Sequence, residues 1–111
     1  MQIDYSDEFK RNLKQLIKKY PHIRQDIEPI IQTLQQGELL GDKIQDCGCV
    51  VYKVRVKNSD IKKGKSAGYR VIYYLQTETE IILITIYSKS DLSDIPSAKI
   101  KQIINEIHNE F

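Results

Sequence analysis

The chain contains 111 residues, enough for one hydrophobic core and too few for two, so we expect a single domain spanning residues 1–111. Its 41% hydrophobic and 29% charged residues are ordinary for a globular protein, and no stretch approaches the roughly 18 apolar residues of a membrane span. The N-terminus lacks the plan of a signal peptide, so we expect a cytoplasmic protein, and the net charge of +2 identifies no class of partner.

The first third of the chain predicts an edge strand followed by helices. Residues 2–5 alternate in polarity, and Ser6 is a good N-cap for a helix that begins with two acidic residues. A second helical pattern is interrupted by Pro29, so we expect a turn of helix from Ile23 to Ile27, a kink, and a further helix that ends before Gly37. The helical spacing is carried by Phe9, Leu13, Leu16, Ile17, Tyr20, Ile23, Ile27, Ile30, Ile31 and Leu34.

Residues 38–47 read as irregular linking chain, and residues 49–56 alternate in polarity and predict a strand. Lys53 and Arg55 share one face of this strand, about 7 Å apart at a rise of roughly 3.3 Å per residue, so both can reach one phosphate. The alternative is a sheet edge that is blunted by charge. Cys47-Gly48-Cys49 lacks the second ligand pair of a zinc site, so we expect no metal and, in a cytosolic protein, no disulfide there.

A hairpin carries the most informative motif of the chain. Residues 64–74 read Gly-Lys-Ser-Ala-Gly-Tyr-Arg-Val-Ile-Tyr-Tyr, a basic loop that becomes an apolar strand from Tyr69 to Leu75. A second apolar strand, residues 81–87, follows a polar connection of hairpin length. Arg70 opens the first strand and Lys89 follows the second, so both lie at the same end of the hairpin. That end is the candidate active site.

Basic residues are concentrated between the first of these strands and the hairpin. Asp60 is the single acidic residue among seven basic ones in residues 53–70. Such an excess is typical of an anion-binding surface, and the alternative is a solvated loop. The basic residues are Lys53, Arg55, Lys57, Lys62, Lys63, Lys65 and Arg70.

The last segment predicts an amphipathic helix. Ser93 or Asp94 can cap it, and Pro96 is tolerated in a first helical turn. Its apolar stripe consists of Ile100, Ile103, Ile104, Ile107 and Phe111.

The order of these elements, with the 64–74 motif and Ile-Tyr-Ser-Lys-Ser-Asp at residues 86–91, resembles the RelE/ParE toxin superfamily. Within it, the chain looks most like the RelE- and HigB-type branch of bacterial type II toxin–antitoxin systems. The resemblance implies an α+β fold, with two N-terminal helices packed on a curved antiparallel sheet and a C-terminal helix. It also implies a ribosome-dependent endonuclease that cuts mRNA, inhibits translation and is neutralised by a cognate antitoxin.

The resemblance also assigns site residues. The family's basic strand pair corresponds to Lys53 and Arg55, its arginine after the Gly-aromatic pair to Arg70, and its C-terminal basic residue to Lys89. Some members carry a catalytic tyrosine at the start of the last helix, where this chain has Asp94-Ile95-Pro96. The sequence therefore does not identify the general base.

The chemistry that this family implies can be argued from the residues. RNA cleavage without a metal or other cofactor needs a base for the 2′-OH, an acid for the leaving 5′-oxygen, and cations on the phosphate. Arg70 suits the last role, because guanidinium is planar, always charged and bidentate. We expect the cations to lower the pKa of a tyrosine or lysine among them, so Tyr87, Lys65 and Lys89 are candidate proton movers. Whether Tyr87 shares a face with Arg70 depends on the hairpin connection. The candidate RNA-binding residues are Lys57, Lys62, Lys63, Lys65 and Tyr69.

Two other functions remain open at this point. ParE-type relatives share the fold but poison DNA gyrase by binding it, without cleaving RNA. A toxin-fold module without activity, which only binds a partner, is the third interpretation. The density of basic residues favours the nuclease, because a protein-binding toxin does not need to hold phosphates.

Overall fold

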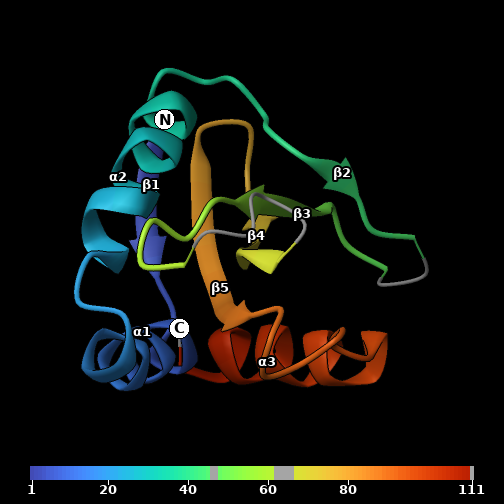
Figure 1. Ribbon diagram of the computed structural model, residues 1–111. Coiled ribbons are helices and arrows are strands. Elements are labelled where there is room, and N and C mark those ends of the chain that lie inside the picture. The colour runs from blue at the N-terminus through green and yellow to red at the C-terminus, as the bar shows by residue number, and fades with distance from the viewer. Residues whose placement is uncertain (46–47, 62–66, 111) are drawn as a thin grey trace.

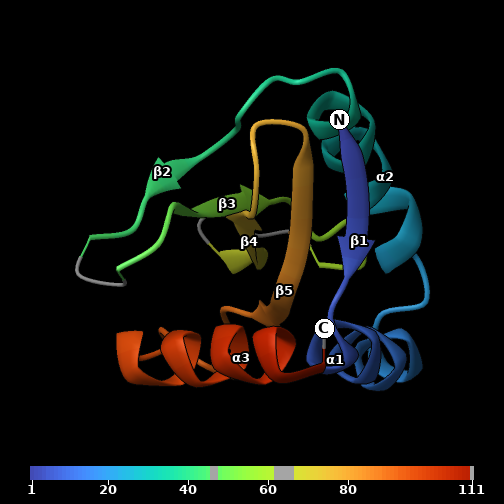
Figure 2. The ribbon, with the colours of Figure 1, turned by 180° about the vertical axis from the view of Figure 1, so that it is seen from behind.

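The computed structural model describes residues 1–45, 48–61 and 67–110, and within them a five-stranded sheet lies between helices (Figures 1 and 2). The strand order is β1-β5-β4-β3-β2, and every neighbouring pair is antiparallel except β1 and β5. The elements are β1 (Gln2–Tyr5), α1 (Asp7–Lys19), α2 (Ile23–Gln35), β2 (Asp42–Lys43), β3 (Val51–Val56), β4 (Tyr69–Leu75), β5 (Glu80–Ser88) and α3 (Ser97–Glu110). The expected α+β fold is confirmed. The sheet is mixed rather than wholly antiparallel, because the long chain between β1 and β5 allows a parallel pairing.

The first helix begins as its sequence predicts. The Ser6 hydroxyl accepts a hydrogen bond from the Phe9 backbone N–H at 3.0 Å, and it donates to the Ile84 carbonyl at 2.7 Å. The N-cap therefore also ties the start of α1 to β5. Phe9 is buried in the first turn, which fixes the side of the helix that faces the sheet.

The second helix differs from its expectation. α2 is one continuous helix from Ile23 to Gln35 that runs through Pro29, rather than a turn of helix followed by a separate helix. Proline removes one backbone donor from a helix interior. Burial of Ile27, Ile31 and Leu34 against the sheet outweighs that loss.

The linking chain after α2 contains a short strand that the sequence did not reveal. β2 pairs with β3 through Asp42 opposite Lys53 and Lys43 opposite Tyr52. Gly41 precedes it with a φ of +89°, and a Cβ there would lie 2.3 Å from the Lys53 carbonyl oxygen. Glycine is therefore required at this close approach to β3.

Two apolar clusters lie on opposite faces of the sheet. One joins α1 and α2 to side chains such as Val54, Val71 and Leu83, and the other joins α3 to side chains such as Ile72 and Ile84. Figure 1 shows β3 running across the view while β5 runs down it, so the sheet is strongly twisted. In the described part of the chain, no helix is long and apolar enough to cross a membrane.

The hairpin has the strand bounds that its sequence predicts for β4 and nearly those for β5. A Cβ at Gly68 would lie 2.0 Å from the Val56 carbonyl oxygen, so glycine lets the start of β4 approach β3. The backbone N–H of Lys89 donates to the Gly68 carbonyl at 2.9 Å. Arg70 and Lys89 therefore lie at the same end of the hairpin, beside the start of the segment that leads to α3 (Figure 2).

Candidate active site

Three adjacent strands bring a row of the predicted site residues into register. Arg55 of β3 lies opposite Arg70 of β4, and Arg70 lies opposite Tyr87 of β5. Residues directly opposite in neighbouring strands share a face, and Lys53 joins that face because it is two residues from Arg55. The structure thus brings four of the five predicted catalytic residues onto one side of the sheet, the side that α3 covers in part.

A β-bulge creates this alignment. The β4–β5 pairing shifts by one residue between Ile72 and Tyr73, so that Tyr73 pairs with Leu83 while Ile72 pairs with Thr85. Without the extra residue, Arg70 would lie opposite Ile86, and Tyr87 would point to the other face. The hairpin connection alone therefore does not determine where Tyr87 points.

The two arginines of the row differ in their exposure. Cross-strand pairs of side chains change the stability of a sheet by roughly 0.2–1 kcal/mol, and two like charges directly opposite each other destabilise it. Arg55 is exposed, whereas Arg70 is only 5% exposed and its Nη1 donates to the Tyr69 carbonyl at 3.1 Å.

Asp94 joins the row from the segment before α3. Its Oδ1 accepts hydrogen bonds from Ile95 N at 2.8 Å, Lys53 Nζ at 3.1 Å and the Tyr87 hydroxyl at 3.4 Å. The Ile95 N–H and the Lys53 ammonium hold the pKa of this carboxyl below its usual range. The sequence predicts Asp94 as a possible cap for α3, but the helix starts at Ser97 and the Asp94 carboxylate contacts Lys53 of β3 instead.

The pKa of Tyr87 moves in the opposite direction to the one we expected. Burial, with a further contribution from the Asp94 charge, raises the pKa of Tyr87 to about 12, although Arg70 acts to lower it. Tyr87 is 8% exposed, so desolvation of the phenolate outweighs attraction by the cation. At neutral pH the hydroxyl is protonated, and it is suited to donate a proton rather than to accept one.

The other predicted site residues do not belong to this row. Lys89 is exposed, and its ammonium donates to the Ser93 carbonyl, which holds the turn after β5. Lys57 is exposed directly after β3. Tyr69, a predicted RNA-binding residue, is fully buried, with its ring edge-on to Tyr20 at 5.7 Å, so the ring offers no exposed face to an RNA base. The remaining predicted residues, Lys62, Lys63 and Lys65, lie outside the described part of the chain.

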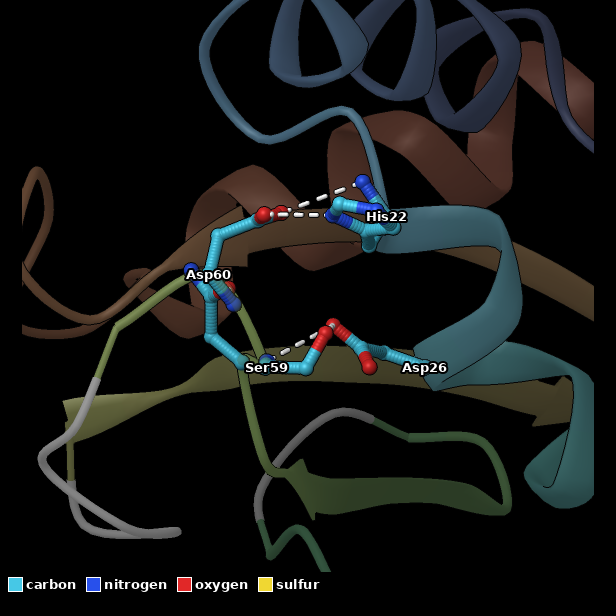
Figure 3. Close-up of polar contacts among 5 residues, drawn as sticks. His22, Asp26, Ser59 and Asp60 are labelled. Atoms are coloured by element: carbon cyan, nitrogen blue, oxygen red, sulfur yellow. Dashed lines mark hydrogen bonds and ion pairs between the residues drawn. The ribbon is translucent and has the colours of Figure 1, made fainter.

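A polar clamp fixes the start of the β3–β4 connection to α2 (Figure 3). Asp60 accepts from the His22 backbone N–H at 3.1 Å, and its other oxygen lies 2.6 Å from His22 Nδ1. In return, Asp26 of α2 accepts from the backbone N–H and the hydroxyl of Ser59, at 2.9 and 3.1 Å. The clamp anchors the connection that follows Lys57.

This clamp predicts a pH dependence of stability. Asp60 raises the pKa of His22, and His22 lowers the pKa of Asp60. The histidine contribution is complete below its unfolded pKa of about 6.5 and is lost as pH rises through the higher folded value. We expect His22→Gln to destabilise the protein more at pH 5.5 than at pH 8.5, as measured by urea unfolding. His108→Gln, which changes the other histidine, should not reproduce this difference, and equal losses at both pH values would contradict the prediction.

Among the described residues, no group of three or more His, Cys, Asp or Glu side chains is placed to hold a metal ion. The face that carries Lys53, Arg55, Arg70 and Tyr87 presents cationic groups and a hydroxyl together, and these are groups from which a phosphate oxygen can accept hydrogen bonds.

One comparison with known proteins bears on this site. Residues 8–109 match the family model described as "RelE toxin of RelE / RelB toxin-antitoxin system". The match runs from the first turn of α1 to the last turn of α3 and includes every candidate residue described above.

Proposed function

Because this chain belongs to the RelE toxin family of toxin–antitoxin systems, we propose that it is a ribosome-dependent endoribonuclease that cleaves mRNA and inhibits translation. In this proposal residues 1–111 form one cytoplasmic toxin domain that works without a metal or other cofactor. The observation that supports it best is the cross-strand pair of Arg55 and Arg70, with Tyr87 next in the row. Guanidinium groups are suited to hold a phosphate, because each is planar, charged and able to donate two hydrogen bonds at once.

Each residue of the row has a role in the proposed reaction. The 2′-oxygen of the substrate attacks the adjacent phosphorus, and the bond to the 5′-oxygen breaks. Arg70, with Lys53 and Arg55 beside it, stabilises the charge that develops on the non-bridging oxygens. Tyr87 donates the proton that the leaving 5′-oxygen needs, which agrees with its raised pKa. Lys65 and Lys89 remain candidates for the base.

The proposed partners follow from the same surface. The RelE family is defined by a toxin that an antitoxin controls, and mRNA and the ribosome are the polyanions that the basic face would meet. We expect a cognate antitoxin to cover this face with acidic residues, since an uncovered basic face would bind polyanions without control.

The experiment that tests this function also distinguishes it from the two alternative functions. Purified protein is added to a reconstituted translation reaction, and mRNA 5′ ends are mapped with and without ribosomes. New mRNA 5′ ends that appear only when ribosomes are present support the proposal. Inhibition of gyrase supercoiling without new RNA ends would favour the ParE-like alternative, and neither effect would favour an inactive binding module.

The basic strand makes a prediction about salt dependence. Arg55→Ala and Lys53→Ala should each weaken binding to single-stranded RNA and lower the slope of log K against log salt, by about 0.7 per lost phosphate contact. Lys101→Ala, an exposed lysine on α3, is the matched control for loss of one charge. Slopes equal to wild type in both strand variants would show that Lys53 and Arg55 are solvated charges only.

A further inference from the structure

The protein's own carboxylate already lies where the proposed site would hold a phosphate oxygen. Three donors from three different segments converge on Asp94 Oδ1: the Lys53 ammonium, the Tyr87 hydroxyl and the Ile95 N–H. An ammonium, a protonated hydroxyl and a backbone N–H are the groups that a phosphate oxygen accepts from. We propose that Asp94 is a built-in competitor, which occupies a substrate phosphate subsite and leaves when RNA binds. This inference rests on the proposed RNA-cleaving function.

The ion pair between Asp94 and Lys53 is weak enough for a substrate to displace. The Asp94 side chain is 65% exposed and the Lys53 side chain 33%, and ion pairs this exposed are weak. An incoming phosphate therefore has little to displace, and it gains the same donors together with Arg55 and Arg70.

The main chain need not move for this exchange. Ser88, at the end of β5, accepts backbone hydrogen bonds from Asp91 and Leu92, both at 3.0 Å, and Lys89 bonds the Ser93 carbonyl. The segment before α3 is thus held by contacts that do not involve Asp94. Rotation of one side chain opens the subsite, and between substrates the carboxylate offsets the repulsion within the basic face.

The test compares two aspartates of the same segment. Asp94→Asn removes the charge at the subsite, whereas Asp91→Asn removes an equal charge whose partner is Lys19 of α1, at 3.0 Å. The probes are inorganic phosphate, through the concentration dependence of Tm, and a short RNA with a 2′-deoxy scissile nucleotide, through its Kd at constant ionic strength. We expect Asp94→Asn to bind both about two- to fivefold more tightly, and Asp91→Asn to bind both like wild type. Asp94→Ala should behave like Asp94→Asn.

Unchanged or weaker binding of phosphate and RNA by both Asp94 variants overturns the proposal. An equal increase in the affinity of Asp91→Asn also overturns it. In ribosome-dependent cleavage, Asp94→Asn should lower KM, because a competitor weakens substrate binding. A fall in kcat with unchanged KM would instead give Asp94 a part in the chemistry and overturn the competitor role. The phosphate and RNA binding measurements need no ribosome. Tighter phosphate binding by the Asp94 variants in a protein that cleaves no RNA would therefore refute the proposed function but still support Asp94 as a competitor for phosphate.

Discussion

Replacement of Arg70 with alanine is expected to slow cleavage of ribosome-bound mRNA by about 10²–10³-fold, the loss typical when one donor to a transition-state anion is removed. Arg70 lies in the middle of the row, between Arg55 and Tyr87, where its guanidinium can hold two oxygens of one phosphate. Single-turnover cleavage, with 5′-end mapping of the products, measures the effect.

Two further variants test whether the planar guanidinium of Arg70, rather than its charge alone, is needed for cleavage. Arg70→Lys keeps the charge but not the planar fork, so it should fall between wild type and Arg70→Ala. Arg24→Ala removes an exposed arginine of α2 and should cleave within about threefold of wild type. Because Arg70 is 5% exposed, thermal unfolding must show that each variant is folded at the assay temperature. A folded Arg70→Ala that cleaves within threefold of wild type would remove Arg70 from the reaction.

The sequence predicts most of the fold because its signals there are local. Ser6 followed by acidic residues and a helical apolar stripe predicts α1, and α1 begins at Asp7 as expected. The β-branched and aromatic run predicts β4 with its observed bounds, Tyr69–Leu75. The local signal at Pro29 misled us, since burial of one helix face outweighs a single missing donor. β2 was missed because two residues carry no periodicity, and its pairing depends on β3.

The site was harder to predict because it depends on contacts between distant residues. Both faces of β4 are buried, so alternation does not show that Tyr69 points into the core while Arg70 points to the site. The bulge at Ile72 that brings Tyr87 opposite Arg70 has no signature in the hairpin sequence. Asp94 has a local interpretation as a helix cap, and its contact with Lys53 is visible only once the segment before α3 is placed on β3.

Replacement of Tyr87 with phenylalanine should slow cleavage by about 10²–10⁴-fold, the usual contribution of a general acid or base, with the fold kept. Burial raises the pKa of Tyr87 to about 12, so the hydroxyl is protonated at neutral pH and acts as a donor. The expected role is therefore the acid that protonates the leaving 5′-oxygen. Tyr52→Phe is the matched control, because that ring stacks on Tyr73 at 5.2 Å, away from the row.

A substrate with sulfur in place of the bridging 5′-oxygen distinguishes an acid from a residue that only positions the phosphate. A thiolate leaves without protonation, so the loss in Tyr87→Phe should shrink to a few-fold on this substrate if Tyr87 supplies the proton. An undiminished loss would mean that the hydroxyl orients the phosphate instead. A loss under about threefold on the normal substrate would exclude both roles and direct attention to Lys65 and Lys89. Lysine-to-arginine changes then separate those two, because arginine keeps the charge but cannot release its proton, and only a lysine needed for charge alone should tolerate the change.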